Sequence, residues 1–128
     1  MEDQNTEWKE SWHDEYLKWV CGFANSKGGT IEIGKNDKGE IVGLPDAEKL
    51  LVVLPNKIRA TMGILVDVNL RKKKSLDYIV IKVKAYPNPI SYRGKYYLRS
   101  GSTTQEVTGS TLDEMVQIFY IRTKLTVH

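Results

Sequence analysis

Two stretches of alternating apolar and polar residues, at positions 64–70 and 79–85, constrain the fold of this chain more than any other feature. Apolar side chains recur at every second position in both stretches, which is the period of a β-strand with one buried face. The polar run at 72–75 between them favours a tight connection. The pattern predicts two antiparallel strands of a one-sided sheet. Its polar face is expected to carry Asp67, Asn69, Arg71, Lys82 and Lys84.

Helical segments and further strands flank this pair. Residues 11–14 fit a helix capping box, and apolar residues recur at helical spacing from 16 to 24 before glycines at 28 and 29 end the helix. Residues 30–34 and 40–44 predict a hairpin across the turn at 36–39. We also expect a helix over 46–58 with a kink or restart at Pro55, a strand at 95–99 and a last helix at 111–122. The predicted fold class is α+β, a mostly antiparallel sheet with helices packed on one face.

Length and composition predict one compact domain over residues 1–128. A chain of 128 residues supports a single sizeable core, and 41% apolar with 27% charged residues is typical of a globular protein. The single cysteine, Cys21, leaves no partner for an internal disulfide and falls on the apolar stripe of the first helix, so we interpret it as a core residue. No apolar run approaches the roughly 18 residues of a membrane span, and the start lacks a signal-peptide pattern. We therefore expect a cytoplasmic protein.

Basic residues are concentrated in the second half of the chain, although the formal net charge is +3. Residues 71–99 contain nine Lys or Arg residues against one acid, Asp77, and three tyrosines at 92, 96 and 97 lie among them. Cations contact phosphates and aromatic rings stack on exposed bases, so this combination predicts a nucleic-acid-binding module that is not itself an enzyme. We expect the phosphates to be contacted through one basic sheet face. Its predicted residues are Arg71, Lys72, Lys73, Lys74, Lys82, Lys84, Arg93, Lys95 and Arg99.

Several short motifs occur in order along the chain. They lie at 7–11 (EWKES), 22–34 (GFANSKGGTIEIG), 37–39 (DKG), 42–43 (VG) and 97–103 (YLRSGST). In this combination, residues 2–105 resemble the Schlafen/AlbA-type DNA-binding domain. The resemblance implies an AlbA-like fold, DNA as the partner and a place at the start of a longer transcriptional regulator. It also implies that residues 1–128 are an excised N-terminal domain, with downstream domains of its own full-length chain as further partners.

Related domains of eukaryotic Schlafen proteins imply a second hypothesis, a metal-dependent RNA endonuclease. Motif matching places its two glutamates and its aspartate on Glu2, Glu7 and Asp37, which would be both the metal ligands and the catalytic residues. Carboxylates suit Mg²⁺ or Mn²⁺, which would activate water beside a phosphodiester. We expect a metal cofactor in this case alone. Lys9 joins Glu7 and Asp37 in a secondary candidate site.

A third hypothesis is that the chain is an assembly domain. Its basic face would then dock on an acidic surface, either of the missing downstream segment or of a second copy in a homodimer.

The glycine pair and the two histidines predict no further site. Gly28 and Gly29 are predicted to end a helix, whereas the glycines of a phosphate-binding loop open one, so we expect any ATP binding to belong to downstream sequence. His13 and His128 are too few and too far apart to predict a zinc site.

Overall fold

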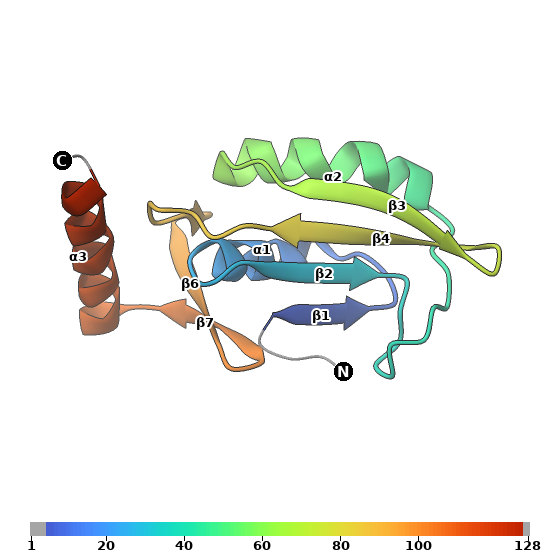
Figure 1. The fold of residues 1–128 in the computed structure, drawn as a ribbon, viewed down its shortest axis with the longest axis horizontal. Coiled ribbons are helices and arrows are strands. Elements are labelled where there is room, and N and C mark those ends of the chain that lie inside the picture. The colour runs from blue at the N-terminus through green and yellow to red at the C-terminus, as the bar shows by residue number, and fades with distance from the viewer. Residues whose placement is uncertain (1–4, 127–128) are drawn as a thin grey trace.

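The computed structural model describes residues 5–126, which form three α-helices and seven strands, and the strands belong to two sheets (Figure 1). The elements are β1 (Thr6–Lys9), a 3-10 helix η1 (Asp14–Tyr16), α1 (Leu17–Ala24), β2 (Gly29–Ile33), α2 (Ala47–Met62), β3 (Asp67–Lys73), β4 (Leu76–Val83), β5 (Ser91–Tyr92), β6 (Lys95–Ser100), β7 (Thr103–Val107) and α3 (Gly109–Thr126).

The strands form two sheets. A four-stranded sheet has the order β1-β2-β4-β3, and a three-stranded sheet has the order β5-β6-β7. Helices α1 and α2 lie on the same face of the four-stranded sheet, behind it in Figure 1. The α+β prediction is therefore confirmed.

The antiparallel pair predicted from the alternating pattern is the hairpin of β3 and β4. Val68 lies opposite Ile81, and Leu70 lies opposite Ile79, so the apolar side chains of both strands share one face. Lys74 and Ser75 connect the strands with φ values of 52° and 66°. Two consecutive residues in the left-handed region make the tight turn whose twist matches that of the strands.

The second predicted hairpin is confirmed only at its turn. β2 pairs with β4 in antiparallel register over Gly29–Ile33 and with β1 in parallel register on its other side, so both of its edges are occupied. Residues 40–44 pair only with the residues just beyond β2, through an isolated antiparallel bridge between Lys35 and Ile41 and backbone hydrogen bonds from Asn36 to Glu40 at 2.9 Å and from Val42 to Gly34 at 2.8 Å. The side chain of Asn36 builds this turn, because its Oδ1 accepts hydrogen bonds from the backbone amides of Lys38 and Glu40, both at 2.9 Å.

The core lies between the four-stranded sheet and the two helices behind it. Val20 and Phe23 of α1 are fully buried, as are Leu54 and Ile58 of α2. α2 continues through Pro55, so the predicted restart there is wrong; buried residues on both sides of the proline hold the two halves against the same sheet. The buried strand residues that meet these helices are Ile31, Ile33, Ile79, Ile81 and Val83.

The start of the first helix also differs from prediction. α1 begins at Leu17, after a short 3-10 turn, and the expected cap at Ser11 is replaced by a contact of its Oγ with His13 Nε2 at 3.3 Å. Asp14 accepts hydrogen bonds from Trp12 Nε1 at 2.8 Å and from Lys57 Nζ of α2. The polar side chains of the predicted capping box therefore have other partners, which are the neighbouring His13 and Trp12 and, for Asp14, the distant Lys57.

α1 also packs against the three-stranded sheet, and a buried amide connects the two. Asn25, at the end of α1, donates hydrogen bonds to the carbonyl oxygens of Ile90 at 2.8 Å and Tyr97 at 2.9 Å, and its Oδ1 accepts one from the amide of Ile90 at 2.7 Å. Met115 and Phe119 are buried on α3, whose observed bounds extend the predicted 111–122 at both ends. Among residues 5–126, no helix combines the length and apolar character that a membrane crossing requires.

The turn between α1 and β2 depends on its two glycines. Gly28 has a φ of +77°, and its amide donates a hydrogen bond of 2.9 Å to the carbonyl oxygen of Phe23, so this left-handed residue closes the turn that follows α1. A Cβ at Gly29 would lie 2.3 Å from ring carbons of Phe23, so the strand approaches this ring at a distance open to glycine alone. The structural role predicted for the pair agrees with this geometry.

Candidate nucleic-acid interface

The face of the four-stranded sheet that the helices leave uncovered is polar. We call it the open face; the register of the strands places Trp8, Glu32, Asn69, Tyr78 and Lys82 on it. Glu32 accepts a hydrogen bond from Trp8 Nε1 at 2.7 Å and forms an ion pair with Lys35 Nζ at 3.0 Å. The centre of the open face is thus a pre-arranged polar network rather than a set of independent side chains.

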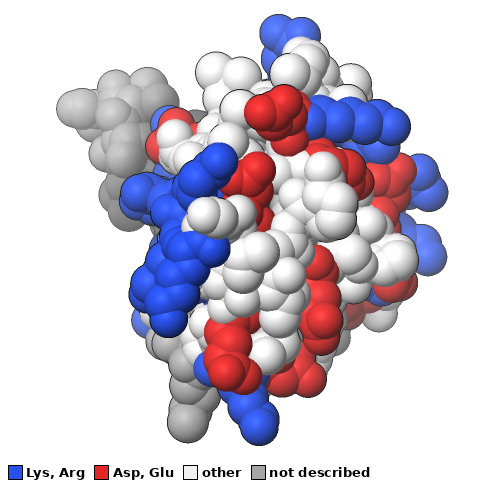
Figure 2. All heavy atoms as spheres, turned by 90° about the vertical axis from the view of Figure 1, so that its right-hand side faces the viewer, with Lys and Arg blue, Asp and Glu red and all other residues white. Residues whose placement is uncertain are grey.

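A run of four cations projects from one end of this sheet. Arg71, Lys72, Lys73 and Lys74, which we call the basic tip, are all exposed at the end of the β3–β4 hairpin. Lys72 Nζ lies 3.6 Å from Asp77 Oδ1, which is too long for a hydrogen bond, and its side chain is 66% exposed. Seen from that end of the molecule, Lys and Arg gather along one side while carboxylates occupy the middle of the view (Figure 2). The basic tip is a concentrated source of positive potential.

A cleft of about 380 Å³ adjoins the basic tip on the open face. Lys73 and Lys74 line one part of it, and Lys35 and Tyr78 line another. The Lys35 ammonium lies 5.2 Å from the centroid of the Tyr78 ring. Sequence reasoning missed both residues, although Tyr78 could have been found by extending the alternation of β4 back from Val80.

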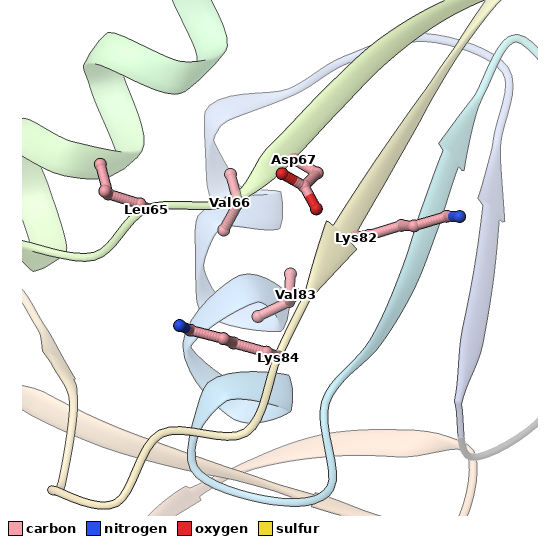
Figure 3. A pocket seen from close by; sticks show the side chains of 6 residues that line it. All are labelled: Leu65, Val66, Asp67, Lys82, Val83 and Lys84. Carbon is pink, nitrogen blue, oxygen red and sulfur yellow. The ribbon is translucent and has the colours of Figure 1, made fainter.

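Lys82 and Lys84 lie at the other end of β4. β4 runs from Leu76 to Val83, a difference of seven positions, so its two ends are about 24 Å apart in an extended strand. The two lysines line a second cleft of about 310 Å³, where their ammonium groups point in opposite directions (Figure 3). Asp67 is the cross-strand partner of Lys82 and lines the same cleft. The cations predicted as one basic face are therefore divided between the two ends of the sheet.

Arg93 and Lys95 form a third group at the β5–β6 turn. Arg93 has a φ of 53° and its guanidinium lies 5.2 Å from the centroid of the Tyr92 ring, while Lys95 pairs with Glu106 at 3.6 Å on the surface. Tyr92 is buried, so its predicted availability for base stacking is wrong. Burial also raises the pKa of the half-buried Tyr97.

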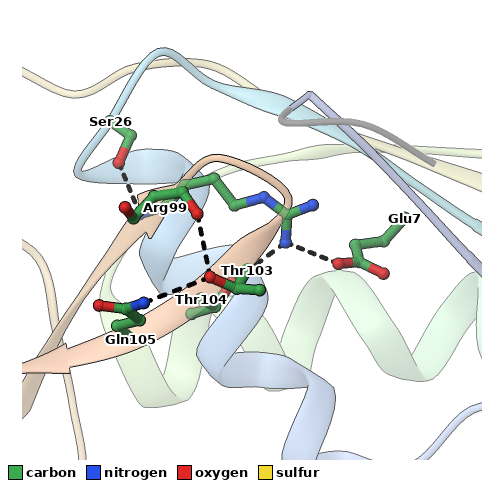
Figure 4. A network of polar contacts seen from close by, with 7 residues as sticks. Glu7, Ser26, Arg99, Thr103, Thr104 and Gln105 are labelled. Carbon is green, nitrogen blue, oxygen red and sulfur yellow. Dashed lines mark hydrogen bonds and ion pairs between the residues drawn. The ribbon is translucent and has the colours of Figure 1, made fainter.

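Arg99 is a correction to the predicted set of phosphate contacts. Its side chain is 3% exposed, and its Nη1 lies 2.6 Å from Oε1 of Glu7, whose side chain is 7% exposed (Figure 4). The guanidinium also lies 4.8 Å from the centroid of the Phe23 ring and 3.3 Å from Thr104 Oγ1. Arg99 therefore joins β6 to β1 in the interior, because the packing of α1 between the two sheets encloses it.

The carboxylate site predicted at Glu2, Glu7 and Asp37 stays a prediction, and the structure describes the surroundings of two of its three residues. Glu7 is neutralised by Arg99, whereas Asp37 is exposed in the Asn36 turn beyond the end of β2. Glu2 lies outside the described residues. Within residues 5–126, no three His, Cys, Asp or Glu side chains gather to form a metal site. The Lys9 ammonium lies 5.1 Å from the centroid of the Trp19 ring, so it faces the aromatic side chains near the start of α1.

Cys21 has the core role predicted for it. It is fully buried, its thiol donates to the carbonyl oxygen of Ile90 at 3.2 Å, and burial raises its pKa to about 11. A thiol with so little thiolate at neutral pH is a poor nucleophile.

Comparison with known proteins identifies the class to which this α+β architecture belongs. The family described as Schlafen, AlbA_2 matches residues 2–108, so the chain belongs to that family. A search of curated proteins finds no match to the chain.

Solved structures that share the fold include the following two. The DIP2311 protein from Corynebacterium diphtheriae aligns at 21% identity with a TM-score of 0.65 over 81% of this chain, which corresponds to 25% of the DIP2311 chain. The N-terminal domain of an ATP-dependent DNA helicase RecG-related protein from Nitrosomonas europaea aligns at 24% identity with a TM-score of 0.55, covering 81% of this chain and 83% of that domain. The chain thus spans about a quarter of the first relative and most of the second.

Proposed function

We propose that this domain binds nucleic acid, DNA in particular, through the basic tip and the open face beside it, as part of a transcriptional regulator. The observation that carries the proposal is the run of four consecutive exposed cations at the end of the β3–β4 hairpin, three on the last residues of β3 and one in the turn. Phosphate contacts of Lys and Arg supply most of the affinity of non-specific nucleic-acid binding. Membership of the Schlafen AlbA_2 family and the DNA helicase-related description of one structural relative support the same class of partner.

The two ends of the open face suit an extended ligand. Arg71, Lys73 and Lys82 belong to positions that face the same side of the sheet, and the basic tip is separated from Lys82 by about the length of β4. A nucleic acid laid along β4 would reach both ends, with the basic tip as the main contact. Arg93 and Lys95 would add contacts if the ligand continued across the three-stranded sheet.

Charge reversal at the basic tip tests the proposal. Binding of a labelled DNA duplex would be followed by fluorescence anisotropy over a range of salt concentrations. Each phosphate neutralised contributes about 0.7 to 0.9 units to the slope of log affinity against log salt, so Lys73→Glu with Lys74→Glu should lower the slope by about 1.4 to 1.8 units. The expected loss of affinity is largest at low salt.

Lys82→Glu with Lys84→Glu is the matched control, because it makes the same change of charge at the other end of β4. We expect it to weaken binding less than the change at the basic tip. Binding that does not depend on salt, or full binding by the tip variant, would mean that these cations only keep the protein soluble. The nuclease hypothesis finds no support in the pairing of Glu7 with Arg99.

A further inference from the structure

The cleft beside the basic tip has two kinds of wall. Lys73 and Lys74 stand on the side of the hairpin end, whereas Ile41, Leu76 and Tyr78 supply apolar and aromatic surface. Leu76 is 38% exposed, so part of its side chain is open to the cleft. The volume of about 380 Å³ is within the range of about 300–1,000 Å³ typical of small-ligand sites.

The aromatic wall is held in position by the polar network of the open face. Lys35 lies over the Tyr78 ring at 5.2 Å and is itself fixed by its 3.0 Å ion pair with Glu32. The Cβ of Tyr78 also packs closely against the backbone at Gly34, where an added Cβ would lie 2.9 Å away. Tyr78 is therefore a pre-organised surface rather than a mobile side chain.

We propose that this cleft takes one unpaired nucleotide of a single DNA strand, with its base against Tyr78 and Leu76 and its phosphate at Lys73 and Lys74. This inference rests on the proposed function and adds a preference for single strands. A duplex presents phosphates on its outside while its bases are stacked within, so it can satisfy the lysines but leaves the apolar wall uncovered. An unpaired base can bury that wall, and stacking on an aromatic ring tolerates any base.

The negative charge of Glu40 determines at which end of the cleft the phosphate of the bound nucleotide lies. Its carboxylate lines the cleft from the Asn36 turn and accepts a hydrogen bond from Asn36 Nδ2 at 3.0 Å. A phosphate is repelled from this side and attracted to the lysines of the hairpin end. The base is therefore placed between the two charged groups.

Anisotropy titrations with a labelled single-stranded oligodeoxynucleotide of about 12 nucleotides and with the duplex of the same sequence test the inference. We expect Tyr78→Ala to weaken single-strand binding by about fivefold to 150-fold, which is the value of one stacked base, and to leave duplex binding unchanged. Tyr78→Phe keeps the ring and should retain single-strand binding. A photoreactive 5-iodo-deoxyuridine in the same strand should cross-link to Tyr78 in the unaltered protein, a readout that needs no variant to fold.

The outcomes separate this inference from the proposed function. Three outcomes would overturn the single-nucleotide site while salt-dependent binding through the basic tip remained. Tyr78→Ala could lose equal affinity for the single strand and the duplex, or it could lose affinity for neither. The cross-links could also avoid residues 35–41 and 73–78. Absence of binding to both probes in the unaltered protein would overturn both. Loss of single-strand binding in Tyr78→Phe as well would contradict stacking on the ring.

Discussion

The buried pair of Glu7 and Arg99 predicts a large and specific loss of stability when one partner is neutralised. The perturbation is Glu7→Gln, which keeps the shape of the side chain and removes its charge. Arg99 would then keep its guanidinium 3% exposed, near Phe23 and Thr104, without the carboxylate that lies 2.6 Å from its Nη1. Removing the opposite charge nearest to a buried guanidinium is costly because water cannot replace the solvation that the carboxylate supplies.

The expected magnitude follows from this geometry. Removing one partner of a buried ion pair costs about 3–5 kcal/mol. The glutamine oxygen can still accept a hydrogen bond from Arg99, so we expect Glu7→Gln near about 3 kcal/mol, the lower end of that range. Arg99→Met should cost more, because it also removes the cation–π contact with Phe23. Both losses are large against a typical total stability of about 5–15 kcal/mol.

Urea denaturation followed by circular dichroism measures these losses, and a double-mutant cycle with Arg99→Met measures the coupling between the two residues. Glu106→Gln is the matched control, because the Lys95–Glu106 pair lies on the surface at 3.6 Å and should contribute only about 0–1 kcal/mol. The reasoning is refuted if Glu7→Gln is no more destabilising than the control. A gain in stability on Glu7→Gln, together with stabilisation of the unaltered protein by magnesium, would instead favour the metal site predicted for Glu7.

Two further predictions concern the core. Gly29→Ala should destabilise the protein by about 1–3 kcal/mol in the same urea assay, because the new Cβ would lie 2.3 Å from the Phe23 ring; an unchanged midpoint would contradict this packing. Cys21 should resist iodoacetamide at pH 8 in the folded protein and react in urea, since burial raises its pKa to about 11. The raised pKa stabilises the fold fully below the ordinary value of 9.0, and this contribution is lost as the pH rises through about 11. Melting temperatures between pH 8 and 11 should therefore fall less in Cys21→Ala than in the unaltered protein.

The strands that sequence reasoning predicted well are those with an uninterrupted alternation. Val68 and Leu70 lie opposite Ile81 and Ile79 as their spacing implies. β1 escaped prediction because it has four residues and because its inward-facing Glu7 is charged, which breaks the apolar pattern that signals a strand. The hairpin predicted for 30–34 and 40–44 forms only at its turn, because β1 and β4 occupy the two edges of β2.

The candidate interface could be predicted in part. The basic tip was contained in the sequence as four consecutive cations, and the hairpin that carries it followed from local periodicity. Lys35 and Tyr78 are 43 positions apart, and nothing in the chain between them indicates that their side chains meet. Lys82 and Lys84 were predicted to act beside the basic tip, but the extension of β4 separates them from it.

The sequence by itself determined the family, the α+β class, the one-sided β3–β4 hairpin and the excess of positive charge at its end, because each is expressed by residues close together in the chain. Only the tertiary structure decided which charges remain available to a ligand. Arg99 and Lys73 are both cations on β-strands, yet Arg99 is enclosed against Glu7 and Phe23 while Lys73 stands in solvent beside a cleft. That difference arises from contacts between residues as much as 92 positions apart, which depend on how α1 packs between two sheets.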